Sequence, residues 1–99
     1  MDALIRRAVI EDYEALCSVW AEVDDLHADA LPRFFRRIRG PVRSLDHVEQ
    51  LLADEDSAIW VAELQNELVG LLTAEIRTAP AYAIFVQRSW VLIEDLVVR

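Results

Sequence analysis

The chain has 99 residues, a net charge of −8 and a hydrophobic content of 55%, which together indicate one globular domain of modest size. Eighteen acidic residues against ten arginines argue against nucleic-acid binding, because phosphate recognition requires concentrated positive charge. No apolar run approaches the roughly 18 residues of a membrane span, and the N-terminus lacks the charged-then-apolar order of a signal peptide.

The first half of the chain predicts one short strand and one long helix. We expect a strand over residues 3–8 and a helix over residues 11–30, followed by a break at Pro32. The apolar face of this helix follows a spacing of three to four residues. It comprises Tyr13, Leu16, Cys17, Trp20, Val23 and His27. Phe34, Phe35 and Ile38 then indicate a further short helical turn, which Gly40 and Pro41 end.

The second half predicts a shorter helix and three strands. Ser44 is a suitable N-cap for a helix over residues 45–54. Residues 58–64 and 68–77 read as a hairpin, with a positive φ at Asn66 in its turn and a bulge near Gly70. A connection of about a dozen residues leads to a last strand over residues 90–98. The resulting order, β-α-α-β-β-β, predicts an α+β fold: a mainly antiparallel sheet with helices packed on it.

Strict alternation in the last strand divides its side chains between two faces. One face would carry Trp90, Leu92, Glu94, Leu96 and Val98, and the other Val91, Ile93, Asp95 and Val97. An acidic side chain among the apolar residues of the first face would have a raised pKa if that face were buried. Glu94 could equally meet solvent or pair with an arginine across the sheet.

Two segments carry a family resemblance. Ile93-Glu94-Asp95-Leu96-x-Val98 resembles the middle strand of the GNAT superfamily of acetyl-CoA-dependent N-acetyltransferases, and Leu26-His27-x5-Arg33-Phe34-Phe35 resembles the segment between the first two helices of many bacterial members. The element order is also that of the N-terminal half of the GNAT fold, so the resemblance covers essentially the whole chain. In the family, the middle strand runs into a glycine-rich loop that binds the pyrophosphate of acetyl-CoA.

The resemblance therefore implies a single, truncated GNAT-like domain over residues 1–99, which stops before that loop. Its only glycines are Gly40 and Gly70. The implied function is transfer of acetyl from acetyl-CoA to a primary amine of an unknown small-molecule or protein acceptor. We expect this chain alone to be inactive, because it lacks the pyrophosphate loop. The alternative is a non-catalytic half-domain that acts through self-association.

The resemblance also assigns candidate residues. Glu94 is the expected catalytic residue, because a carboxylate beside the amine can remove its proton as a general base. The backbone of Leu96, Val97 and Val98 would pair with the pantetheine arm of acetyl-CoA, as an added strand does. The candidate acceptor-binding residues are Asp25, His27 and Asp95. Glu75, on the neighbouring strand, could supply a further carboxylate.

Other readings of the polar residues are less specific. A lone histidine on an apolar helix face, such as His27, is also compatible with a packed side chain. His27 and His47 are the only histidines, and no spacing matches a metal site, so no metal is expected. Cys17 is the only cysteine and lacks an activating base, which indicates a core residue and a reducing, cytoplasmic setting. The last strand would be an exposed edge, and we expect a homodimer or higher oligomer through it.

Overall fold

The computed structural model describes residues 2–99 and contains two α-helices and four strands in these residues. In chain order they are β1 (Leu4–Arg7), a 3-10 turn η1 (Ile10–Asp12), α1 (Tyr13–Ala30), α2 (Leu45–Ala53), β2 (Ser57–Leu64), β3 (Glu67–Thr78) and β4 (Ser89–Val98). The predicted α+β class and element order are confirmed, with bounds that shift by one or two residues.

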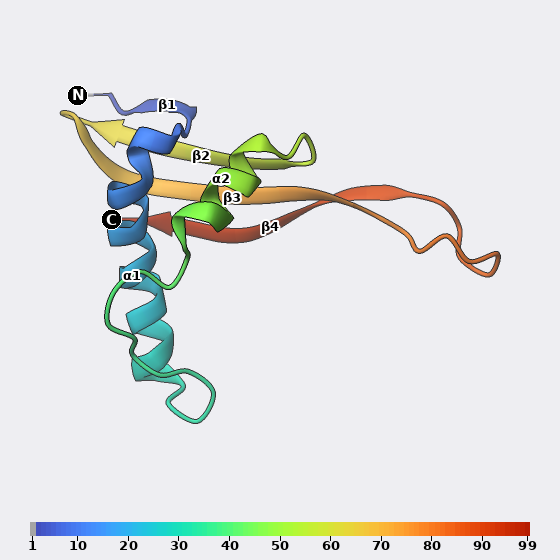
Figure 1. The fold of residues 1–99 in the computed structure, drawn as a ribbon, viewed down its shortest axis with the longest axis horizontal. Helices are drawn as coiled ribbons and strands as arrows, with labels where there is room; N and C mark the ends of the chain where they lie inside the picture. The colour runs from blue at the N-terminus through green and yellow to red at the C-terminus, as the bar shows by residue number, and fades with distance from the viewer. Residues whose placement is uncertain (1) are drawn as a thin grey trace.

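The four strands form one antiparallel sheet in the order β1-β2-β3-β4 (Figure 1). Both helices pack on the same face of this sheet, α2 against β2 and α1 against β3 and β4. β1 and β4 are therefore the edge strands within residues 2–99. Among these residues, no helix is both long enough and apolar enough to cross a membrane.

One hydrophobic core lies between the sheet and the two helices. Its buried members are Ala8, Leu16, Val19, Trp20, Val48, Ile59, Val61, Leu68 and Leu71. The predicted apolar face of α1 is correct at Leu16 and Trp20, but it omitted Val19, which is fully buried. The prediction that His27 also lies on this apolar face was wrong, because His27 is exposed. The reason is geometric: the C-terminal half of α1 extends past the sheet, so nothing on the sheet covers that end of the helix (Figure 1).

Side-chain hydrogen bonds fix both helix starts. Ser44 Oγ accepts a hydrogen bond of 3.1 Å from the His47 N–H, as predicted for an N-cap. The start of α1 has no Ser, Thr or Asn cap. Asp12 instead accepts the N–H of Val9, the residue before the 3-10 turn, at 2.9 Å, while Arg6 donates two hydrogen bonds to the same carboxylate. The chain reversal before α1 is thus tied to β1.

The hairpin between β2 and β3 turns through two residues with positive φ, Gln65 at 52° and Asn66 at 64°. The prediction for Asn66 is confirmed. The predicted bulge near Gly70 is also present, because the register passes from Ala62 opposite Gly70 to Glu63 opposite Leu68. A Cβ on Gly70 would lie 2.9 Å from the backbone oxygen of Val97, so the close approach of β4 explains the glycine.

The segment from residue 31 to residue 44 crosses back along α1 without forming a helix. The N–H groups of Phe34 and Phe35 both bond to the Leu31 oxygen, at 3.0 Å each, and make a single turn. The predicted helical turn at Phe34, Phe35 and Ile38 is therefore limited to this one turn. Near its end, the segment places Arg43 close to Asp95 of the sheet, directly before α2 begins.

Candidate functional site

The centre of β4 contains a β-bulge. Asp95 pairs with Thr73 and Ile93 pairs with Ala74, which leaves Glu94 without a cross-strand partner. Because one extra residue shifts the alternation of a strand, Glu94 and Asp95 both lie on the side of the helices. The expectation that Asp95 occupies the opposite face was wrong. Leu96 and Val98, expected beside Glu94, lie on the far side instead.

The bulge gathers three carboxylates around a small cavity between β3, β4 and the helices. The cavity has a volume of about 40 Å³. Its lining includes Glu75, Glu94 and Asp95 together with Trp20, Arg43, His47, Leu51, Ser57, Ala58, Ile59, Thr73 and Ala74. Thr73 Oγ1 donates a hydrogen bond of 2.9 Å to Asp95 Oδ2, so one carboxylate of the group is held in place from the neighbouring strand.

Glu94 has an unusual electrostatic environment for a carboxylate. Partial burial raises its pKa, and a hydrogen bond with Glu75 and the charge of Glu75 raise it further. Arg77 opposes this effect, with its Nη2 3.7 Å from Glu94 Oε1, and also pairs with Glu75. The Glu94 side chain remains 47% exposed. A carboxyl group with raised proton affinity is thus accessible from solvent.

Arg43 connects the loop, α1 and the carboxylates. Its guanidinium lies 4.6 Å from the centre of the Trp20 ring, 2.9 Å from Asp24 Oδ2 and 3.9 Å from Asp95 Oδ1. Its backbone oxygen accepts a hydrogen bond of 2.7 Å from the hydroxyl of Tyr13. The sequence showed Arg43 only as one of five arginines in a short run. Nothing in that pattern distinguishes it, because its partners are brought together by the tertiary fold.

A second small cavity lies beside the first, between α1 and the loop that ends at Arg43. It is lined by Cys17, Trp20, Ala21, Asp24, Asp25, Arg36, Ile38, Gly40, Pro41, Val42 and Arg43. Trp20 and Arg43 form part of both cavities. The indole Nε1 of Trp20 is buried and has no hydrogen-bond partner among the described residues.

The structure brings only some of the candidate acceptor-binding residues together. Asp95 lies in the carboxylate cavity, and Asp25 lines the adjacent one, 3.5 Å from Arg37. His27 lines neither cavity. Its exposed ring lies 5.3 Å from the ring of Phe35 near the outer end of α1. Within residues 2–99, no group of three or more His, Cys, Asp or Glu side chains is arranged to hold a metal ion.

The residues expected along the pantetheine arm lie on β4 beyond the bulge. Leu96 and Val98 are exposed on the sheet face that the helices leave open, beside Ile5, Trp60 and Leu72. Val97 is opposite Leu71 and packs against the core. The outer edge of β4 has no strand beside it within residues 2–99. Extended backbone of this kind fits an amide-containing arm, whereas two isolated glycines provide no glycine-rich pyrophosphate loop.

The sequence matches no protein-family profile and no curated protein. Solved structures do resemble the chain. Two variants of the BH1408 protein of Bacillus halodurans superpose with TM-scores of 0.86 and 0.84, each with 23% identity. The matches cover 97% and 96% of this chain and 61% of each variant. An acetyltransferase from Vibrio fischeri superposes with a TM-score of 0.72 and 20% identity, over 96% of this chain and 68% of its own length.

These likenesses show the fold. The chain has an α+β architecture that it shares with part of the Vibrio fischeri protein, and this architecture is consistent with half of a GNAT fold. It spans about three fifths of the length of the first two structures.

Proposed function

We propose that this chain provides the amine-activating part of an acetyl-CoA-dependent N-acetyltransferase. The observation that carries the proposal is the bulge in β4, which places Glu94 beside Glu75 and Asp95 at one cavity. The accessible Glu94 side chain and its raised pKa support the role of a general base. The fold shared with an acetyltransferase supports the class of reaction.

In the proposed reaction, Glu94 accepts a proton from the ammonium group of the acceptor. The freed nitrogen attacks the carbonyl carbon of the acetyl thioester, a C–N bond forms and the C–S bond breaks. The nitrogen loses its second proton as the amide forms, and the CoA thiolate takes up a proton and leaves as the thiol. The proton on Glu94 returns to solvent. A raised pKa favours this role because it brings the proton affinity of the carboxylate closer to that of the amine.

The neighbouring carboxylates favour a cationic acceptor. Asp95, held by Thr73 and close to Arg43, would orient the ammonium group, and Glu75 would add negative potential at the same cavity. Asp25 in the adjacent cavity would contact a more distant part of the acceptor. Since His27 lines neither cavity, its proposed contact would require an acceptor long enough to reach the outer end of α1.

The acetyl donor would lie along β4. Leu96, Val97 and Val98 follow the bulge directly and have a free strand edge within residues 2–99. The pantetheine amides would pair with this edge in the way an added strand does. The thioester would then lie next to Glu94, since the bulge and the free edge belong to the same strand.

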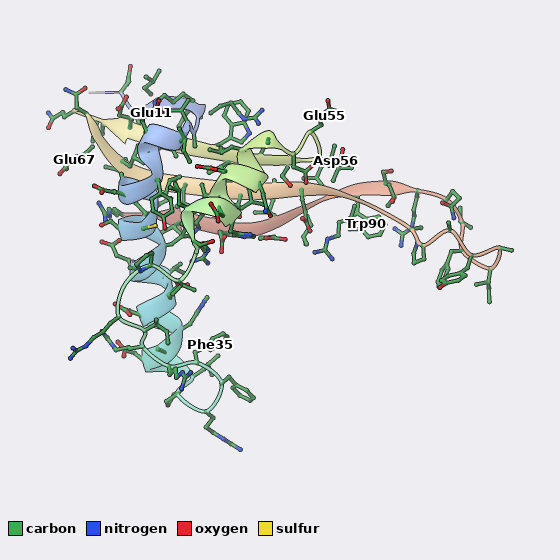
Figure 2. The ribbon with its side chains drawn as sticks, in the orientation of Figure 1. Glu11, Phe35, Glu55, Asp56, Glu67 and Trp90 are labelled. Atoms are coloured by element: carbon green, nitrogen blue, oxygen red, sulfur yellow. The ribbon has the colours of Figure 1, made fainter. Side chains whose placement is uncertain are left out.

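The test is an assay of acetyl-CoA-dependent thiol release with the protein as its gene encodes it. The acceptors would be polyamines, amino sugars, amino acids and peptides with a free amine. We expect turnover with at least one class, and a loss of about 100-fold or more in kcat for Glu94→Gln, the usual size of a general-base contribution. Glu55→Gln, in the exposed turn before β2 (Figure 2) and not among the residues that line the cavity, serves as the matched control and should retain full activity.

Two results would refute the proposal. One is the absence of thiol release with every class of amine, together with no binding of acetyl-CoA in calorimetric titration. The other is turnover that Glu94→Gln leaves unchanged, because the cavity would then have no role in proton removal.

A further inference from the structure

The outer part of the β3–β4 hairpin, residues 76–91, projects beyond the rest of the molecule as an arm (Figure 1). β2 pairs with β3 only as far as Glu75, so the arm is a ribbon of two strands. Its strands are joined by the pairs Ile76–Val91, Arg77–Trp90 and Thr78–Ser89 and by the Ala79 N–H to the Arg88 oxygen. An isolated two-stranded hairpin is only marginally stable in water.

The surface of this arm is apolar. Seven large side chains on it are between 38% and 85% exposed: Ile76, Tyr82, Ile84, Phe85, Val86, Trp90 and Val91. Three of the seven are aromatic, and such side chains bury roughly 150–250 Å² each. The seven together expose roughly several hundred Å² of apolar surface, distributed over both faces of the ribbon. The largest apolar patch of a typical monomer is about 300–600 Å² and often functional, and a stable interface buries about 800 Å² per partner. The arm can therefore supply a large part of an interface.

The charge of the arm is opposite to that of the body. Arg77 and Arg88 are its only charged residues, and all 18 acidic residues of the chain lie outside it. Arg77 is engaged at the base by Glu75 and Glu94. Arg88 lies 5.0 Å from the centre of the Trp90 ring and makes no ion pair within residues 2–99. One free cation thus lies beside an exposed aromatic ring.

From this combination we propose that the arm docks on the acidic body of a second copy of this chain. Pairing of arm with arm would bring like charges together, which disfavours it. Contact between arm and body brings opposite charges together and covers the apolar residues. In a dimer with two-fold symmetry, the arm of each copy binds the body of the other copy, so the same contact occurs twice.

A suitable receiving surface exists on the body. Between η1 and α2 lies an open hollow lined by Arg7, Ala8, Val9, Ile10, Glu11, Glu49, Leu52 and Ala53. It offers apolar side chains together with two carboxylates, Glu11 and Glu49, and one guanidinium, that of Arg7, which lies over the Trp60 ring at 5.3 Å. Neither carboxylate makes an ion pair within residues 2–99. The hollow therefore matches the apolar tip and the free Arg88 of an incoming arm.

The experiment is sedimentation velocity of the protein as its gene encodes it, from 1 to 100 µM, a range that brackets typical transient and stable dimers. We expect a dimer for the unchanged protein. The triple variant Ile84→Ser, Phe85→Ser, Val86→Ser should raise the dissociation constant at least about 30-fold, roughly 2 kcal/mol. The matched control, Leu26→Ser with Phe34→Ser, removes exposed apolar side chains away from the arm and should leave the dimer intact.

A charge variant tests the same contact without altering the apolar tip. Arg88→Glu should weaken the dimer about 10-fold or more and remove most of its salt dependence. Glu49→Arg in the same chain should restore part of the affinity. Far-UV circular dichroism of every variant establishes that each one folds.

Three outcomes would overturn the inference. The unchanged protein could be a monomer at 100 µM, the dimer could survive the triple variant, or the control could dissociate as readily as the triple variant. The second outcome would indicate a different interface, such as the free edge of β4. The inference does not depend on the proposed catalytic function, because sedimentation reports association whether or not acetyl transfer occurs.

Discussion

Glu94 and Asp95 are neighbours in the chain and nevertheless face the same side of the sheet, because Glu94 is the extra residue of the bulge in β4. In a regular strand, one of the two carboxylates would face away from the helices. The bulge instead places both at one cavity, with Glu75 from β3 beside them. Bulges often re-aim side chains at functional sites, and this one creates the group of carboxylates on which the proposed function rests.

The first prediction concerns the ionisation of Glu94. Partial burial raises its pKa, Glu75 raises it further and Arg77 lowers it. We therefore expect Glu75→Gln to bring the pKa of Glu94 down and Arg77→Gln to bring it up. Carbon-13 NMR of the Glu94 carboxyl, followed through a pH titration, measures both changes. An unchanged midpoint in both variants would show that the three side chains do not interact in solution.

The raised pKa of Glu94 also makes the stability of the folded protein depend on pH. The pKa of Glu94 is higher in the folded state than in the unfolded chain, so the folded state binds more protons between the two values. Protonation of Glu94 therefore stabilises the folded state at pH values below the ordinary pKa of a glutamate. This stabilisation is lost as the pH rises through the higher pKa that Glu94 has in the folded state. Glu94→Gln should therefore raise the melting temperature at pH 7 and have little effect near pH 4. Equal changes in melting temperature at both pH values would contradict a raised pKa of Glu94 in the folded state.

The sequence predicted the elements better than it predicted the site. Local signals such as Ser44 before a helix or Asn66 in a tight turn act within a few residues, and the structure confirms both. The bulge at Glu94 was not predictable in this way, because an added residue in a strand changes the register without changing the residue pattern. The contact of Arg43 with Trp20 depends on the path of a whole loop, which no local pattern specifies.

A second prediction concerns the link between β1 and the start of α1. Hydrogen bonds from Arg6 lower the pKa of Asp12, the Val9 N–H lowers it further, and burial partly opposes them. Ionised Asp12 therefore stabilises the folded state at pH values above its ordinary pKa of 3.8. This stabilisation is lost as the pH falls through the lower pKa that Asp12 has in the folded state. At pH 7, Asp12→Asn should cost about 1.5–3 kcal/mol of unfolding free energy.

Urea unfolding from pH 7 to pH 2 measures this effect. The difference between the unchanged protein and Asp12→Asn should narrow as the pH falls below about 4. Glu11→Gln, at an exposed neighbouring position, is the control and should stay within about 0.5 kcal/mol of the unchanged protein. A constant difference across the whole range would exclude ionised Asp12 as the source of the stability.

A third prediction tests the role of Arg43. The guanidinium stacks on Trp20 while it bonds to Asp24 and approaches Asp95. A lysine cannot present a flat face to the ring and a fork to carboxylates at the same time. We expect Arg43→Lys to lower the unfolding free energy by about 1–3 kcal/mol and to increase quenching of tryptophan fluorescence by acrylamide. Arg33→Lys, at an exposed position in the same loop, should change neither quantity.

The final prediction concerns Gly70, a residue of β3 that lies against the backbone of β4. An alanine Cβ at this position would lie 2.9 Å from the Val97 oxygen, a backbone atom that cannot rotate away. The two strands must then separate, and we expect Gly70→Ala to lower the unfolding free energy by about 1–3 kcal/mol.

Gly40→Ala is an informative comparison, because it separates crowding from backbone conformation. Gly40 has open space around its Cα but a φ of +80°, so alanine there should cost roughly 1–2 kcal/mol through the backbone alone. Amide hydrogen exchange distinguishes the two effects. Gly70→Ala should speed exchange at Leu71 and Val97, whereas Gly40→Ala should leave local exchange in β4 unchanged. Equal protection of these amides in both variants would mean that the strands accommodate the methyl group without separating.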